Sequence, residues 1–419
     1  MALLKNRFLS VSFKNSFQII FRFLVGLINM KVVAIYTGPT GMALFGQLQN
    51  ALQLGTTISN LGFTNGIIKY TSQNNLSPNE RQSIISTSIT LTLIASLVLG
   101  SIVMIMSEEI SVHLFKTKEY NFICQLIGIH LISSSMLNLI LSIYNGLMRL
   151  KRFIIINLIN SFFLLLLVSL GTIFFNVKGM LWALIFQSLF SLIFAFFLLS
   201  KDRINFKLAI SKAACLKLGN YSLMTLVSGI VGPLVLIIIR DILIHNETLH
   251  NAGIWESINK ISNSYIVLLT SAFNFYLLPK FSSLKSSSSI RKEVISTLKI
   301  LIPVLLLGAA SMYFLRKPII STLFSQEFSE AGQIIRWQII GDFFKVISWV
   351  FAYLLISKTK TIAFVISEVA SGILQVSFSK IMILKYGLEG STMAYGLENA
   401  IYFIILLLFF FYYWGFKKE

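Results

Sequence analysis

Twelve runs of about 20 mostly apolar residues follow one another along the chain, and each is long enough to cross the hydrocarbon core of a bilayer as a helix. They occupy residues 16–36, 42–62, 84–106, 122–145, 153–176, 179–200, 222–244, 253–277, 298–315, 334–356, 361–384 and 392–414. Backbone groups inside lipid must be hydrogen-bonded within their own segment, which favours helices. The runs therefore predict an all-α membrane protein with twelve transmembrane helices.

The composition excludes a soluble enzyme and a disordered protein. Only 12% of the 419 residues are charged and 56% are hydrophobic, whereas soluble domains carry about 25% charged residues. The net charge of +19 does not indicate nucleic acid as a partner, because no basic helix or aromatic-basic RNA motif accompanies it.

Basic residues alternate from loop to loop. The loops on one side hold 21 Lys and Arg and those on the other side hold 7, among them Arg240. Cytoplasmic loops carry the excess of Lys and Arg in membrane proteins. The bias predicts a multi-pass protein with both termini in the cytoplasm.

An internal repeat at an offset of about 210 residues relates the two halves of the chain. It pairs Arg81 with Arg291 and Gly179 with Gly390, and the triplet 85–87 with 295–297. Six predicted helices separate equivalent points, so the halves have the same orientation. We expect two parallel six-helix bundles around a central cleft, at residues 1–200 and 219–419, joined by a basic cytoplasmic linker at residues 201–218.

Polar side chains form a stripe on the second predicted helix and again on the eighth. Gln49, Gln53 and Asn60 share one helical face with Thr56 and Thr64. The repeat offset places Asn259, Asn263, Thr270 and Asn274 at equivalent positions. One such stripe is often contact between helices, worth about 0.6 kcal/mol per hydrogen bond. Two matched stripes favour a water-filled cleft between the halves.

Charged residues inside predicted helices cost about 2.5–3.5 kcal/mol each on insertion scales. They either pair with one another, as the i,i+4 spacing of Glu256 and Lys260 allows, or line a functional cavity. Amides and hydroxyls suit sugar hydroxyls, and Arg22 and Lys260 suit phosphate oxygens. The predicted substrate-binding residues are Arg22, Lys31, Gln49, Gln53, Asn60, Asn259, Lys260, Asn263, Thr270 and Asn274.

Several segments in order along the chain resemble the Wzx-type polysaccharide flippases. They are residues 35–41, 66–70, 253–255, 276–279 and 336–346. The likeness covers nearly the whole chain and is closest to the O-antigen and enterobacterial common antigen translocases. The resemblance implies the fold of the multidrug/oligosaccharidyl-lipid/polysaccharide exporters.

The resemblance also implies an activity and partners. Such proteins move undecaprenyl-diphosphate-linked oligosaccharides, here an O-antigen repeat unit for lipopolysaccharide, from the cytoplasmic to the periplasmic leaflet of the bacterial inner membrane. Alternating access coupled to H⁺ or Na⁺ is expected, as are contacts with membrane lipid and with the polymerase and chain-length proteins of the pathway. The family's cavity cations map onto Arg22, Lys31 and Lys260. For ion coupling we select Asp342, Lys345 and Glu368.

Two alternatives remain open from the sequence. A cation-coupled multidrug antiporter of the same fold should have an acidic, aromatic site, whereas the first-half residues here are basic. A membrane glycan polymerase or ligase needs a large outer loop, which the chain lacks. No catalytic, cofactor or metal motif is found, and the four histidines are interpreted as surface-loop residues. We therefore predict a transporter, not an enzyme.

Overall fold

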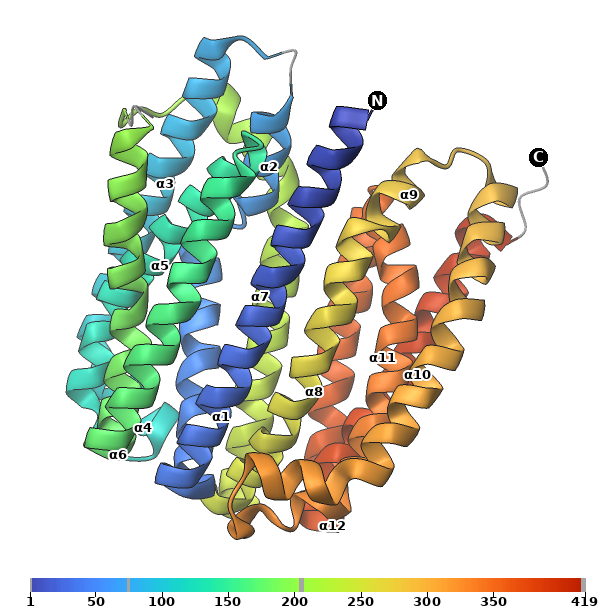
Figure 1. Ribbon diagram of the computed structural model, residues 1–419. Coiled ribbons are helices and arrows are strands. Elements are labelled where there is room, and N and C mark those ends of the chain that lie inside the picture. Colours follow the sequence, from blue (N-terminus) through green and yellow to red (C-terminus); the bar gives the residue numbers. More distant parts are fainter. Residues whose placement is uncertain (1, 74–75, 203–206, 416–419) are drawn as a thin grey trace. The chain divides into compact units, whose positions relative to one another are not determined.

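The computed structural model describes residues 2–73, 76–202 and 207–415, and for the helical residues 2–16, 220–221 and 274–275 it describes the backbone alone. Within these ranges all regular structure is helical and no β-strand is found (Figure 1). The first half forms α1 (Ala2–Ser59), α2 (Thr64–Ser72), α3 (Pro78–Ile105), α4 (Ser107–Phe115), α5 (Asn121–Gly146) and α6 (Leu150–Lys201). The second half forms α7 (Lys212–Asn246), α8 (Leu249–Phe275), α9 (Leu277–Ser283), α10 (Ser287–Leu323), η1 (Gln326–Phe328), α11 (Ala331–Ser357), α12 (Thr361–Phe410) and η2 (Phe411–Gly415).

Nine helical stretches in the described ranges are long and apolar enough to cross a membrane. The number is smaller than the twelve predicted runs because α1, α6 and α12 each combine two of them. A helix satisfies its own backbone hydrogen bonds, which is what lipid requires. The chain is an all-α, multi-pass membrane protein.

Helix α6 folds back on itself at Asn176, where the backbone is not helical (φ 49°, ψ −136°). A straight helix of 52 residues would be about 78 Å long. Instead Arg152, near its start, contacts Asp202, directly after its end, with Nη2 2.7 Å from Oδ1. A Cβ atom on Gly179 would lie 2.1 Å from the carbonyl oxygen of Gly171. The two predicted helices are therefore arms of a hairpin joined by a break rather than by a loop.

Helices α12 and α1 contain similar breaks. Gly387 in α12 has φ 58°, a conformation that glycine adopts without a Cβ penalty. The hydroxyl of Tyr402 donates to Glu368 Oε1 at 2.6 Å, so residues 34 positions apart in this helix meet. In α1, Gly38 (φ 61°) precedes Pro39. A straight α1 of 58 residues would measure about 87 Å, far more than a bilayer core of about 30 Å.

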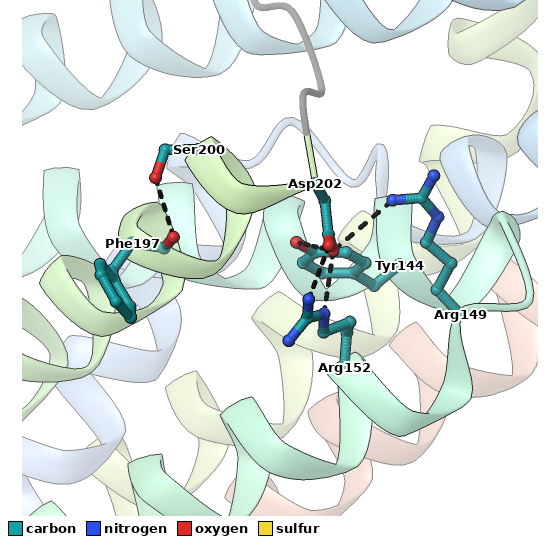
Figure 2. A network of polar contacts seen from close by, with 6 residues as sticks. All are labelled: Tyr144, Arg149, Arg152, Phe197, Ser200 and Asp202. Carbon is teal, nitrogen blue, oxygen red and sulfur yellow. Dashed lines mark hydrogen bonds and ion pairs between the residues drawn. The ribbon is translucent and has the colours of Figure 1, made fainter.

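A polar network ties the two ends of α6 to α5 (Figure 2). Asp202 accepts hydrogen bonds from Arg152 Nε at 3.0 Å and from the Tyr144 hydroxyl at 3.1 Å, and Arg149 Nη1 lies 3.5 Å from Oδ2. The hydrogen bond from Arg152 is the main cause of a pKa of Asp202 below its ordinary value. This network closes the α6 hairpin at the end where the predicted linker begins.

Contacts divide the chain into two compact units. Unit 1 comprises Met1–Thr37 and Leu44–Leu234, and unit 2 comprises Gly38–Ala43 and Val235–Glu419. The break in α1 thus belongs to unit 2, and α7 contributes to both units. The bundle limits drawn from the repeat, 1–200 and 219–419, stay a prediction.

The predicted linker at residues 201–218 belongs to unit 1 and, where it is described, packs against the rest of that unit. Residues 203–206 lie outside the described part. Ala209 N and Ser211 N donate to Thr90 Oγ1 and Thr87 Oγ1 of α3 at 3.1 and 3.0 Å. Helix α7 already begins at Lys212, and Leu218 is buried in a cluster with residues of α2, α3 and α5. The described part of the predicted linker is therefore a segment hydrogen-bonded to α3, followed by the first turns of α7.

Candidate functional site

A polar cavity of about 610 Å³ lies within unit 1, lined by α1, α2, α5, α6 and α7. Its polar lining residues are Arg22, Gln49, Gln53, Thr56, Thr57, Asn60, Thr64, His130, Ser134, Asn138, Asn157, Asn160, Ser161, Gln187, Ser188, Thr225 and Ser228. Such a wall is unusual inside helices that cross lipid, where unsatisfied polar groups are costly. The space therefore suits water or a polar ligand.

The polar stripe predicted on the second helix borders this cavity. Gln49 and Gln53 line it from the part of α1 that follows the break, and Asn60 lines it directly after the end of this helix. Their spacing keeps the three residues on one side. Thr56 lies between them and its hydroxyl is 2.7 Å from that of Ser134 on α5. The part of α1 that precedes the break contributes Arg22. These predicted residues are brought together in unit 1.

Arg22 gives the described part of the cavity wall a fixed positive charge. Arg22 is exposed toward the cavity and makes no ion pair with the residues that the structure describes. Asp and Glu are absent from the described residues that line the cavity. Lys31, the other predicted cation of the first half, is exposed on α1 and does not border it. The cavity can therefore offer a guanidinium to an anionic group.

Most of the lining residues were not selected from the sequence, and three of them are described here. Asn160 and Gln187 on α6 each bury an amide oxygen without a hydrogen-bond partner in the structure. His130 on α5 is buried, with Nδ1 3.1 Å from the Ile185 carbonyl oxygen. A carbonyl only accepts, so Nδ1 carries the hydrogen. The interpretation of His130 as a surface-loop histidine is wrong, because it faces α6 across a tertiary contact.

The residues predicted on the eighth helix differ from one another in burial and in hydrogen bonding. Asn259 on α8 is buried and its amide nitrogen has no partner, whereas Asn263 is exposed. Thr270 donates to the carbonyl oxygen of Val267 at 3.0 Å. The side chain of Asn274 lies outside the described part.

A buried ion cluster joins α7 and α8 within unit 2. Arg240 is 0% exposed and donates to Glu256, and Lys260 Nζ lies 3.2 Å from the other oxygen of Glu256. The Arg240 guanidinium also lies 5.4 Å from the Trp255 ring centre. Placing Arg240 in an outer loop was therefore wrong, because a tertiary partner on α8 allows its burial. Lys260 is paired as its i,i+4 spacing predicts.

A second cluster in unit 2 gathers the predicted coupling residues. Asp342 on α11 is 4% exposed and accepts hydrogen bonds from Ser262 at 2.6 and 2.7 Å, from Tyr395 at 2.7 Å and from Tyr265. On α12, Glu368 accepts from Tyr402.

The third acid, Glu398, and the lysine Lys345 complete this cluster. Glu398 accepts from Ser371 at 2.6 Å. Lys345 lies over the rings of Trp349 and Tyr395 and interacts electrostatically with all three acids. In the described ranges no group of three or more His, Cys, Asp or Glu is arranged to hold a metal. The cluster thus presents three buried or half-buried carboxylates, each of which accepts a hydrogen bond from a hydroxyl.

Solved structures share the fold. An inward-facing multidrug resistance MATE family transporter of the MOP superfamily matches with a TM-score of 0.77 at 14% identity, covering 95% of this chain and 98% of the other. The lipid II flippase MurJ in an inward closed conformation matches with a TM-score of 0.72 at 16% identity, covering 96% and 87%. The chain therefore has the helical fold of these transporters.

Sequence relatives and a family model show the family of the chain. The lipid III flippase of Escherichia coli (strain K12) is 25% identical over 382 residues, 90% of this chain and 92% of the relative, and that of Shigella flexneri matches equally. Among such relatives the chain is a transporter rather than an enzyme, so the polymerase or ligase alternative is not retained. The model described as polysaccharide biosynthesis protein matches residues 13–285, and the chain therefore belongs to the polysaccharide biosynthesis protein family.

Proposed function

We propose that the protein is a flippase for lipid-linked saccharide precursors in the bacterial inner membrane. Its cargo is an oligosaccharide on undecaprenyl diphosphate, with an O-antigen repeat unit favoured over enterobacterial common antigen. The observation that carries the proposal is the cavity in unit 1, which has a polar wall and a cation without an ion-pair partner among the described residues. The relatives named lipid III flippase support it.

The cavity chemistry fits a sugar diphosphate. Each uncompensated hydroxyl of a sugar costs several kcal/mol on transfer into hydrocarbon. The amides of Gln53, Asn160 and Gln187 offer hydrogen bonds to those hydroxyls, and Arg22 offers a charge-assisted one to a phosphate oxygen. A volume of about 610 Å³ lies within the usual range for ligand pockets, about 300–1,000 Å³. The lipid tail meanwhile stays in the bilayer.

The second half of the chain completes the proposed path. Twelve crossings in two six-helix bundles, with both termini cytoplasmic, would let the α8 residues Asn259, Lys260 and Asn263 meet the cargo in alternating access. Lys31, Thr270 and Asn274 belong to the same proposed path. The breaks at Asn176 and Gly387 occupy equivalent places in the repeat, which supports this division.

Ion coupling is assigned to the acidic cluster of unit 2. Asp342 and Glu368, with Lys345 beside them, would exchange H⁺ or Na⁺ during the cycle. Asp342→Asn should remove the response of transport to an imposed pH or sodium gradient. Gradient-driven transport at the wild-type rate in this variant would reject the assignment.

A multidrug antiporter is the weaker reading of the same fold. Cationic drugs need acids in their binding cavity, whereas the described lining of the cavity in unit 1 includes Arg22 and no acid. Drug resistance in cells that express the protein should therefore not rise.

The proposed function is tested by Arg22→Ala with Arg22→Lys as its matched control. The purified protein is reconstituted with a fluorescent polyprenyl-diphosphate oligosaccharide, and translocation is followed by a quencher that cannot cross the membrane. Losing a charged hydrogen bond of about 1.5–3 kcal/mol should slow translocation about 10- to 150-fold, while the lysine variant keeps part of the rate. No translocation by the wild-type protein, or an unchanged rate in Arg22→Ala, would overturn the proposal.

A further inference from the structure

A separate, apolar pocket of about 400 Å³ lies within unit 2, between α8, α10 and α11. Its wall is built from Leu268, Leu269, Val304, Met312, Ile339 and Phe343. Among its described lining residues the ionisable groups are Asp342 and Tyr265. The pocket thus joins a hydrocarbon-like space to one buried carboxylate.

The carboxylate of Asp342 has hydrogen-bonding capacity left. Its two oxygens provide about four acceptor positions. The hydroxyls of Ser262, Tyr265 and Tyr395 bring three hydrogens, because Ser262 reaches both oxygens with a single one. One acceptor position therefore remains for a donor that arrives through the pocket.

The same carboxylate also lacks a direct counter-charge. None of the described Lys, Arg or His residues forms an ion pair with Asp342. Lys345 acts on it electrostatically, but its ammonium lies 5.2 Å from the centre of the Tyr395 ring and does not line the pocket. Burying an uncompensated charge is expensive, and an added cation with a hydrogen bond relieves the cost.

We propose that this pocket binds lipophilic amines, meaning molecules with an apolar body and one protonated nitrogen. The body packs against the leucines and Phe343, and the ammonium donates to Asp342 and faces the Tyr265 ring, a favourable partner for a cation. Charge complementarity distinguishes this occupant from a neutral hydrocarbon chain. Where Asp342 serves the proposed ion coupling, an amine there inhibits transport without being transported.

The chain offers a variant that fills the pocket and leaves Asp342 untouched. Gly308 on α10 lines the pocket, and a Cβ atom there would meet nothing within 4 Å. Gly308→Leu therefore starts its side chain in open space beside the pocket and should narrow it. Gly26 on α1, where a Cβ atom is equally free, gives the matched control Gly26→Leu in unit 1.

The test measures binding to the purified full-length protein by the rise of its thermal unfolding midpoint. The probes are phenylhexylamine and its neutral analogue phenylhexanol. For the wild-type protein we expect saturable stabilisation by the amine and at least tenfold weaker binding of the alcohol. Asp342→Asn and Gly308→Leu should each bind the amine at least tenfold more weakly, whereas Gly26→Leu should bind it like the wild type. Equal binding of amine and alcohol, or undiminished amine binding in Gly308→Leu, would overturn the proposal. Because the readout does not depend on transport, its failure is distinct from failure of the flippase proposal.

Discussion

Neutralising Glu256 should destabilise unit 2 strongly, because this carboxylate serves two cations. Arg240 is fully buried beside one of its oxygens, and Lys260 Nζ lies 3.2 Å from the other. Glu256→Gln keeps the size of the side chain and removes its charge. It leaves two neighbouring positive groups without this carboxylate.

The magnitude follows from the burial of Arg240. Removing one partner of a buried pair costs about 3–5 kcal/mol, because the remaining charge stays out of water. In domains of 150–250 residues each kcal/mol lowers the unfolding midpoint by about 2–4 °C. We therefore expect the midpoint to fall by about 6–20 °C.

The assay is thermal unfolding of the purified protein in detergent, with two comparisons. Lys260→Gln removes a partly exposed partner, 22% accessible, and should cost at most about 1 kcal/mol. The double variant Arg240→Met with Glu256→Leu removes both buried charges and should recover most of the stability, since apolar replacements of buried pairs are often neutral.

Two outcomes would refute this reasoning. A midpoint for Glu256→Gln equal to that of Lys260→Gln would mean that the carboxylate is not a buried counter-charge. A double variant less stable than Glu256→Gln would mean that the arginine is not destabilised by losing its partner.

Three further changes test the hairpins and the network at the end of α6. Gly387→Ala forces φ 58° on a residue with a Cβ atom 2.8 Å from Glu247 Oε1, and should lower the free energy of unfolding by about 1–2 kcal/mol. Gly308→Ala, where a Cβ atom has open space, is the control and should not destabilise the protein. An equal loss of stability in the two variants would contradict the strain assigned to Gly387. Gly179→Val would press a side chain against the carbonyl oxygen of Gly171 and should prevent recovery of monodisperse protein, whereas Gly26→Val should not. Asp202→Asn should lower the unfolding midpoint at neutral pH. Arg152 holds the pKa of Asp202 below its unfolded value near 3.8. The stability difference between the wild type and Asp202→Asn should therefore vanish as the pH falls through the lowered pKa. A difference that persists in strong acid would contradict this role of the ionised carboxylate.

The sequence alone determined which segments are helical and apolar. In lipid, each crossing segment must form its backbone hydrogen bonds within itself. This requirement is local, so apolar runs of about 20 residues are enough to predict the helices. What the runs did not reveal is how neighbouring helices join. The hairpin in α6 depends on Asn176 and on the close approach of Gly171 and Gly179, which are tertiary contacts.

The residues of the candidate site also fall into those that the sequence predicted and those that only the folded chain brings to the cavity. Gln49, Gln53 and Asn60 were predictable because one helix sets their common face. His130, Asn160 and Gln187 border the same cavity from other helices.

Tertiary structure decided which charged residues are buried and which groups they contact. The burial of Arg240 and the three hydroxyls around Asp342 depend on partners up to 80 positions away. Apolar periodicity is a property of one segment, whereas the pairing of a polar group in lipid is a property of whichever segment lies beside it. Only the folded chain decides that neighbour.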